Sequence, residues 1–386
     1  MDSHRPAVVL APDSFKGSLA APDVCTAWTE GLQRVWPHAD IRARPMADGG
    51  EGTLAAVLAA VGDQGSRSQL RVRGAGNETT SAAWGLLEQP QGRVAVIESA
   101  QVVGITDAAG MRVPVNDRST RGVGELIRAV LDSGVRRFMI GLGGSSTNDG
   151  GAGMLSALGL VLLDANGGTV APTPAGLAAL AAVDATSIDP RLRETDVTIM
   201  SDVSNPLCGP RGATAIFGSQ KGVTERDRDD VDRTLARFAS LAEAALGRPV
   251  AQLPGAGAAG GLGFALQLVG GRFASGARVV AGLIGLDEAL HGADWAITGE
   301  GRTDAQTLLG KAPFIVAEAA TRAGVHVSLL SGALDAKALP ELGARFAGCF
   351  ALPDAPMTLA ECMANAPSAL ANRVEQMARL FAASRR

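Results

Sequence analysis

The pattern of apolar and polar positions predicts alternating strands and helices at both ends of the chain. Short apolar runs with β-branched residues are typical of strands buried in a parallel sheet, and longer Ala/Leu-rich runs are typical of helices. Near the N-terminus the predicted strands span 7–11 and 41–45, and the helices span 22–36 and 54–61. Near the C-terminus the strands fall within 294–301, 326–331 and 345–352, and the helices within 312–323 and 358–382.

The middle of the chain has a different texture. Residues 66–98 alternate and predict a meander of short strands. Further strands are predicted at 135–142 and 196–203, and helices at 120–133, 175–183 and 224–246. Because the two ends resemble each other and the middle does not, we predict an α/β protein with two unlike α/β domains. Residues 1–66 and 285–386 form a doubly wound, flavodoxin- or Rossmann-like parallel-sheet domain, and residues 67–284 form a second α/β domain inserted into it.

Composition excludes several classes of protein. The 386 residues are 46% hydrophobic and 19% charged, which is typical of a folded globular chain. A net charge of −4 gives no basic surface for nucleic acid. No apolar run reaches the ~18 residues of a membrane helix, and the N-terminus lacks the features of a signal peptide. The four cysteines are scattered, so we expect reduced thiols and a cytoplasmic protein without membrane or nucleic-acid partners.

The few lysines stand beside glycines. Of 35 basic residues only four are lysines, and Lys16, Lys221 and Lys311 each lie next to a glycine. Since routine surface charge in this chain is arginine, a lysine in a Gly-rich block suggests a compact point charge at a phosphate. Chance placement in exposed loops remains the alternative for any one of them.

A glycine-rich turn at 143–151 follows the predicted strand 135–142. A strand, a glycine-rich turn and a helix form an anion site in outline, because backbone N–H groups and the helix N-terminus face the ligand. Asp149 within this turn fits a metal ion or a reacting hydroxyl beside the phosphate. The alternative is that Asp149 only caps the following helix.

Carboxylates stand at the ends of five predicted strands. They are Asp13, Asp48 with Glu51, Asp149, Asp202, and Glu300 with Asp304. Together with lysines, Arg302 and glycine-rich turns, they are the groups that magnesium-assisted phosphoryl transfer requires. The chain has no Walker loop, no protein-kinase motif set and no G-x-S-x-G elbow. Residues 255–263, GAGAAGGLG, are either a second nucleotide-binding turn or a site of close helix packing.

Several long motifs resemble those of the bacterial glycerate kinase family. In chain order they are APDSFKGS (11–18), ADGGEGT (47–53), GGSSTNDGGAGM (143–154), SDVSNPLCGPRGA (201–213), QKG (220–222), GAAGG (257–261) and TGEGRTDAQTLLGKAP (298–313). The resemblance covers nearly the whole chain. It implies phosphorylation of D-glycerate by ATP with Mg²⁺, 2-phosphoglycerate as product, and a site in the cleft between two nested domains. Gly17, Ser219 and residues 98–105 depart from the usual pattern, which affects the acceptor specificity more than the reaction class.

These observations give a set of expected site residues. The predicted catalytic residues are Asp13, Lys16, Asp48, Asp149, Asp202 and Arg302. The predicted nucleotide-binding residues are Gly143, Gly144, Ser145, Ser146, Thr147, Asn148, Lys221, Gly299, Glu300 and Lys311. The predicted metal ligands are Asp149, Asp202, Glu300 and Asp304.

The sequence leaves several roles open. The general base is one of Asp48, Asp149 and Asp202, and Arg302 is the candidate cation for the glycerate carboxylate. The alternatives to glycerate 2-kinase activity are phosphorylation at the 3-hydroxyl, a related small sugar acid as acceptor, or a non-catalytic sensor of a sugar acid or nucleotide. We expect a monomer or a homodimer.

Overall fold

The computed structural model describes residues 5–384 and separates the chain into two compact units. Unit 1 comprises Met1–Asp48, Ala55–Gly62 and Ala277–Arg386, and unit 2 comprises Gly49–Leu54 and Asp63–Gly276. The sequence-based boundaries at 66 and 285 differ from this division at three short segments. Residues 49–54 and 63–66 group with unit 2, and residues 277–284 group with unit 1.

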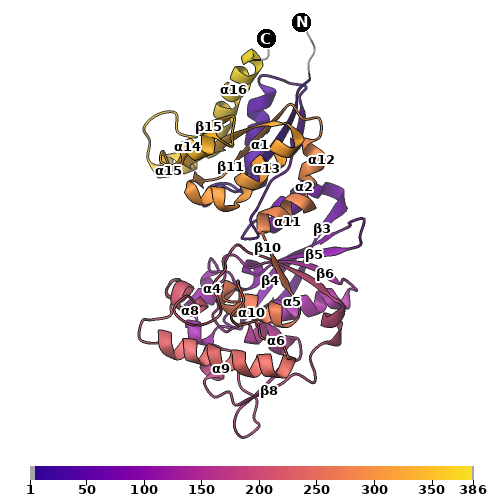
Figure 1. Cartoon of the computed structure of the whole chain (residues 1–386), viewed down its shortest axis with the longest axis vertical. Coiled ribbons are helices and arrows are strands. Elements are labelled where there is room, and N and C mark those ends of the chain that lie inside the picture. The colour runs from indigo at the N-terminus through magenta and orange to yellow at the C-terminus, as the bar shows by residue number, and fades with distance from the viewer. Residues whose placement is uncertain (1–4, 385–386) are drawn as a thin grey trace. The chain divides into compact units, whose positions relative to one another are not determined.

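Unit 1 is built on a five-stranded parallel sheet with the order β15-β13-β11-β1-β2 (Figure 1). Its strands are β1 (Ala7–Pro12), β2 (Asp40–Ala43), β11 (Trp295–Gly299), β13 (His326–Ser331) and β15 (Gly348–Ala351). From β1 the chain moves one way to β2, and from β11 it moves the other way to β13 and β15. The direction of winding therefore reverses between β1 and β11, which is the topological switch point where ligands bind in open α/β sheets.

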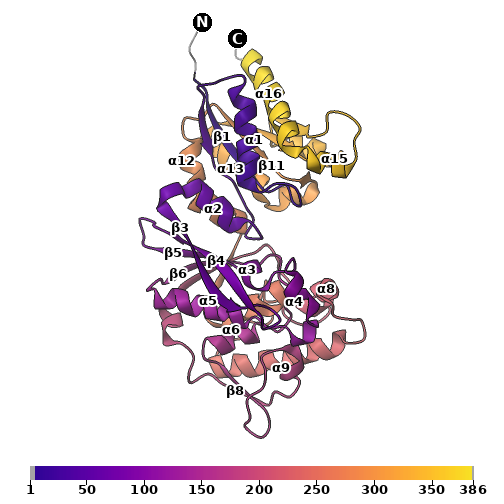
Figure 2. The same ribbon diagram turned by 180° about the vertical axis from the view of Figure 1, so that it is seen from behind.

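Helices cover this sheet and connect its strands. They are α1 (Ala21–Gln33), most of α2 (Thr53–Val61), α11 (Gly276–Leu283), α12 (Leu286–Leu290), α13 (Ala312–Ala323), α14 (Leu339–Gly343), α15 (Leu359–Ala364) and α16 (Ala366–Ser384). Helices α1 and α16 lie side by side, with Val24, Trp28 and Leu32 spaced by four residues along the buried face of α1 (Figure 2). The two ends of the chain thus share one core.

Unit 2 contains a six-stranded mixed sheet with the order β10-β9-β6-β5-β4-β3. Its strands are β3 (Gly65–Arg73), β4 (Thr79–Leu87), β5 (Val94–Glu98), β6 (Arg137–Gly141), β9 (Asp196–Met200) and β10 (Arg272–Ala274). The first three strands pair antiparallel, as the alternating segment 66–98 predicts, and the remaining pairs are parallel. The two unlike α/β sheets confirm the predicted fold class.

The helices of unit 2 enclose a separate hydrophobic core. They are α3 (Ala100–Val103), α4 (Ala108–Arg112), α5 (Arg121–Asp132), α6 (Ala152–Ala157), α7 (Pro174–Leu177), α8 (Ala213–Phe217), α9 (Arg228–Leu246) and α10 (Leu262–Leu268). Buried Leu126, Phe138, Phe238 and Phe264 belong to this core. Within residues 5–384, no helix combines the length and the apolar character that crossing a membrane requires.

One predicted helix is wrong. The Ala/Leu-rich segment 175–183 forms only the single-turn helix α7, and the chain then enters strand β8 (Ala182–Asp184). Strand β8 pairs antiparallel with β7 (Val161–Leu163). Helix propensity is therefore overridden here by a strand partner about 20 residues earlier in the chain.

Candidate functional site

The carboxyl edge of the sheet in unit 1 brings three predicted carboxylates together. Asp13 directly follows β1, and Glu300 directly follows β11 at the topological switch point. The two strand ends are joined by a hydrogen bond of 2.8 Å from the Asp13 N–H to the Gly299 carbonyl. The charges of Asp48 and Glu300 both act on Asp13, so these three residues form what we call the acidic cluster.

Asp13 holds its proton unusually strongly. Burial is the largest of the effects that raise the pKa of this carboxyl from 3.8 to about 7, and the negative charges of Asp48 and Glu300 act in the same direction. The Ser14 N–H, which donates to Asp13 Oδ1 at 2.6 Å, acts in the opposite direction. A carboxylate with a pKa near neutrality is suited to accept a proton from a hydroxyl group at physiological pH.

Glu300 is fixed by neighbouring hydroxyl groups. Its Oε1 accepts hydrogen bonds from Thr303 Oγ1 at 3.1 Å and Thr307 Oγ1 at 2.6 Å. The Lys311 ammonium lies 4.0 Å from Oε2. Burial raises the pKa of Glu300, while these hydroxyls and Lys311 oppose the rise. Glu300 and Lys311, predicted separately as nucleotide-binding residues, are therefore neighbours.

The loop of residues 13–20, here named the Lys16 loop, leads from β1 into α1. Phe15 is buried and anchors the loop, whereas Lys16 is exposed. The loop closes through a hydrogen bond of 2.9 Å from the Phe15 N–H to the Leu19 carbonyl. Gly17 has φ +79°, a conformation that glycine adopts without strain. The lysine is thus presented to solvent from a well-anchored turn.

Arg302 and Asp304 lie in the segment that follows Glu300. Arg302, in the short strand β12 (Arg302–Thr303), is exposed. Asp304 caps the 3₁₀ helix η6 (Ala305–Leu309), because its Oδ1 accepts the Gln306 N–H at 2.9 Å. This bond favours a structural role for Asp304, which the sequence analysis placed among the metal ligands.

In unit 2 the glycine-rich turn, residues 143–151, follows β6 and ends at α6. Asp149 is completely buried there. One of its oxygens accepts the Gly151 N–H, and the other accepts the Gly153 N–H together with the N–H and hydroxyl of Thr120, all at 2.8–3.1 Å. Burial raises the pKa of this carboxyl, and the hydrogen bonds counteract the rise. The geometry favours the capping alternative for Asp149.

The hydroxyl and amide side chains of this turn point inward. Ser145, Ser146, Thr147 and Asn148 are all buried, and only Gly143 and Gly144 remain accessible. The Lys221 ammonium is buried as well, donating to Ser145 Oγ at 3.0 Å and to the Thr147 carbonyl at 2.8 Å. Desolvation lowers the pKa of Lys221 to about 7. Lys221 therefore supports the turn from inside, and of the residues predicted to bind the nucleotide here Gly143 and Gly144 are the accessible ones.

The block 255–263 supports the turn by close packing, one of the two alternatives left open. Gly150 donates its N–H to the Gly260 carbonyl at 2.9 Å. Gly260 has φ +66°, and a Cβ added there would collide with the Thr147 carbonyl. The glycine is needed because two stretches of backbone touch at this point.

Unit 2 holds two further buried charged residues, which local sequence patterns do not reveal. Arg118 is 3% exposed and donates from Nη1 to the carbonyls of Ser146 and Lys221, at 2.9 and 3.0 Å. Glu98 is 1% exposed, and its Oε1 accepts the Leu54 N–H at the start of α2. Nothing in the sequence separates Arg118 from the many surface arginines, since its burial results from contacts with residues distant in the chain.

The four predicted metal ligands do not form one cluster. Asp149 and the exposed Asp202, which follows β9, belong to unit 2, whereas Glu300 and Asp304 belong to unit 1. Across residues 5–384, no group of three or more His, Cys, Asp or Glu side chains is arranged to hold a metal ion without other ligands. A metal that depends on these carboxylates must therefore take part of its coordination from a bound substrate or water.

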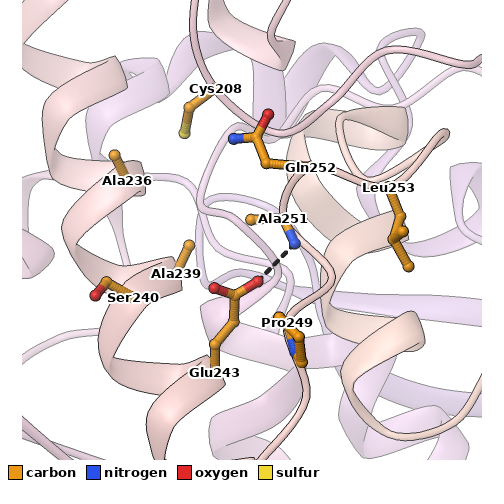
Figure 3. A pocket seen from close by; sticks show the side chains of 9 residues that line it. All are labelled: Cys208, Ala236, Ala239, Ser240, Glu243, Pro249, Ala251, Gln252 and Leu253. Carbon is orange, nitrogen blue, oxygen red and sulfur yellow. Dashed lines mark hydrogen bonds between the residues drawn. The ribbon is translucent and has the colours of Figure 1, made fainter.

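A hollow of about 240 Å³ opens in unit 2 between α9 and residues 249–253 (Figure 3). Glu243 projects toward it from α9 and accepts the backbone N–H groups of Val250 and Ala251 at 2.6 Å each. Burial and the charge of Asp232 raise the pKa of the Cys208 thiol on its wall to about 12, which disfavours the nucleophilic thiolate form. None of the predicted site residues lines the hollow, and its chemistry suggests no reaction.

Comparisons with known proteins agree on one family. The model of the glycerate kinase family matches residues 8–382. The chain is 43% identical over 333 residues to a glycerate kinase of Bacillus subtilis (strain 168), covering 85% of each chain. It is 40% identical over 328 residues to the glycerate 2-kinase of Escherichia coli (strain K12), again covering 85% of each. A crystal structure from Salmonella typhimurium LT2, assigned as glycerate kinase 2, matches with a TM-score of 0.86 and 38% identity, covering 99% of this chain and 100% of that one.

Proposed function

Because the chain belongs to the glycerate kinase family and is therefore a kinase acting on an alcohol group, we propose that it transfers the terminal phosphoryl group of ATP to the 2-hydroxyl of D-glycerate. The observation that carries this proposal is the position and the pKa of Asp13. Its carboxyl stands at the topological switch point of unit 1 with a pKa of about 7. A proton acceptor of this kind is what an attacking hydroxyl group needs.

Asp13 is the proton acceptor in this mechanism. It takes the proton of the glycerate hydroxyl as the oxygen–phosphorus bond forms and the bond to the ADP oxygen breaks. Asp149, one of the three carboxylates considered from sequence, already accepts four hydrogen bonds in its buried position. Burial is the largest cause of the raised pKa of Asp13, and the negative charge of Asp48 adds to it.

The basic residues of unit 1 bind the anionic groups of the substrates. Lys16, exposed on its anchored loop, neutralises phosphate oxygens, and Lys311 does so beside Glu300. Arg302 is exposed and its planar guanidinium suits the glycerate carboxylate. In unit 2, the backbone of Gly143 and Gly144 is the accessible part of the glycine-rich turn for an anionic group.

Mg²⁺ fits the acidic cluster. Repulsion among Asp13, Asp48 and Glu300 is reflected in the raised pKa of Asp13, and a divalent cation relieves such repulsion. Mg²⁺ needs only one or two protein carboxylates when phosphate oxygens and water complete its shell. Asp48 and Glu300 would hold it, and it would neutralise charge on the transferred phosphoryl group. We also propose cytoplasmic action, since the four cysteines are unpaired.

The test is ATP turnover with D-glycerate, followed by ³¹P NMR of the product. We expect ADP formation that requires D-glycerate and Mg²⁺, with 2-phosphoglycerate as the product. Formation of 3-phosphoglycerate would correct the position of transfer, and ATP binding without turnover would favour a sensor. Asp13→Asn should lower kcat by at least ~10²-fold. The matched control is Asp335→Asn, because Asp335 also lies in unit 1 and accepts a nearby backbone N–H, that of Lys337, at 2.9 Å.

A further inference from the structure

Exposed apolar side chains gather at one short stretch of unit 1. Among residues 5–384, eight large apolar side chains are exposed, and three of them lie within seven residues: Met357, Leu359 and Met363. Leu359 is 76% exposed. Scattered exposed apolar residues need no explanation, whereas exposed apolar side chains that lie close together are typical of surfaces that bind a ligand or a partner.

Leu359 and Met363 are carried by the well-defined helix α15, and Met357 directly precedes its N-cap Thr358. Helix α15 starts with a capping box, in which Thr358 Oγ1 accepts the Glu361 N–H and Glu361 Oε2 accepts the Thr358 N–H. Leu359 and Met363 are four residues apart, so they lie on the same face of the helix. We name Met357, Leu359 and Met363 together the α15 face. Its exposure is a property of an ordered helix.

The α15 face meets the Lys16 loop. Ser18 Oγ donates to the Met363 carbonyl at 3.2 Å, and a Cβ added at Gly17 would lie 3.3 Å from Met363 Cε. Figure 2 shows α15 beside the indigo chain that leads into α1. The apolar face thus begins at the loop that presents Lys16 and extends away from it by about one helical turn, or ~5.4 Å.

We propose that the α15 face receives the purine base of the nucleotide whose phosphates bind at the Lys16 loop; this inference rests on the proposed use of ATP. A nucleotide is charged at one end and flat and apolar at the other. The Lys16 loop and the α15 face offer the same two chemistries in neighbouring segments, an exposed lysine on an anchored turn and a group of exposed apolar side chains. Methionine side chains suit an aromatic ring, because they are flexible and their sulfur is polarisable.

The first test compares Leu359→Ser with Leu380→Ser. Leu380 is a matched control, since it is 63% exposed on α16 of the same unit and far along the helix from the Lys16 loop. We expect Leu359→Ser to raise KM for ATP about fivefold to tenfold, with kcat and KM for D-glycerate within twofold of wild type and Leu380→Ser unchanged. Unchanged KM for ATP in an active Leu359→Ser enzyme overturns the inference and leaves the proposed function intact.

One further variant and one further measurement test other locations of the base and other uses of the α15 face. Leu309 is 85% exposed near Lys311, and if Leu309→Ser alone raises KM for ATP, the base lies there instead. If Leu359→Ser weakens a homodimer in sedimentation analysis and leaves KM for ATP unchanged, the face is an interface between copies. Either result overturns the inference.

The second test does not depend on turnover. Cys362 lies on α15 three residues after Leu359 and is partly exposed. We expect ATP, without glycerate, to slow the alkylation of Cys362 by N-ethylmaleimide, as followed by peptide mass spectrometry. Cys349, which is also partly exposed, serves as the internal control. Inorganic tripolyphosphate has no base and should not protect Cys362. Equal protection by tripolyphosphate, or none by ATP, contradicts the proposal.

Discussion

Replacing Asp13 by Asn should stabilise the fold while it removes activity. Asn keeps the shape of the side chain and an oxygen that can accept the Ser14 N–H, but it carries no charge. The ionised carboxylate is unfavourable in the folded protein because it is desolvated and lies near the charges of Asp48 and Glu300. A catalytic role would explain why the protein keeps a residue that lowers its stability.

The size of the effect depends on pH. Each unit between a folded and an unfolded pKa corresponds to about 1.4 kcal/mol. The pKa of Asp13 rises from 3.8 to about 7 on folding, so above pH 7 Asp13→Asn can raise the free energy of unfolding by at most about 4 kcal/mol. Because Asp13 is only partly buried from solvent, we expect a gain of roughly 1–3 kcal/mol. The sign follows from linkage. Below about pH 4 Asp13 is protonated in both states and does not destabilise the wild type, and the loss of stability grows as the pH rises toward 7 and is constant above it.

The assay is urea unfolding of wild type, Asp13→Asn and the Asp335→Asn control, in EDTA and without nucleotide. Tryptophan fluorescence reports mainly on unit 1, which holds Trp28, Trp36 and Trp295 of the four tryptophans. We expect Asp13→Asn to be more stable than wild type at pH 8 and equal to it at pH 4. The reasoning is refuted if Asp13→Asn is no more stable than wild type at pH 8, or if the difference is the same at both pH values.

Three further substitutions test the other assignments. Lys16→Met should lower kcat/KM by ~10²-fold or more with little change in Tm, because an exposed lysine contributes little to stability; normal kinetics would exclude its phosphate role. Asp149→Asn should lower the free energy of unfolding by about 2–4 kcal/mol, because an amide cannot accept all four hydrogen bonds. A variant with full stability and poor turnover would make Asp149 a candidate general base again. Lys221→Met should lower the free energy of unfolding by about 1–3 kcal/mol, because Ser145 Oγ and the Thr147 carbonyl lose their donor. In the same denaturation experiment, Lys337→Met on the surface should leave the free energy of unfolding almost unchanged.

Local sequence patterns determined most of the secondary structure. The helix predicted at 312–323 and the strand predicted at 326–331 coincide with α13 and β13, because hydrophobic periodicity and glycine boundaries act over a few residues. The meander over 66–98 forms β3, β4 and β5. The motifs also pointed to the family, whose model matches residues 8–382. The predicted site residues were drawn from those same blocks.

Only the tertiary structure decided what each candidate carboxylate does. Asp13 and Asp149 both follow a strand and lie near glycine, so the sequence treats them alike. In the fold, Asp13 lies beside two other negative charges at the switch point of unit 1, whereas Asp149 accepts hydrogen bonds from two N–H groups at the start of α6 and from the N–H and hydroxyl of Thr120. The difference arises from partners such as Thr120 and Glu300, which are distant in the chain. The ionisation and the role of a side chain depend on burial and on neighbouring charges, and the packing of the whole chain sets both.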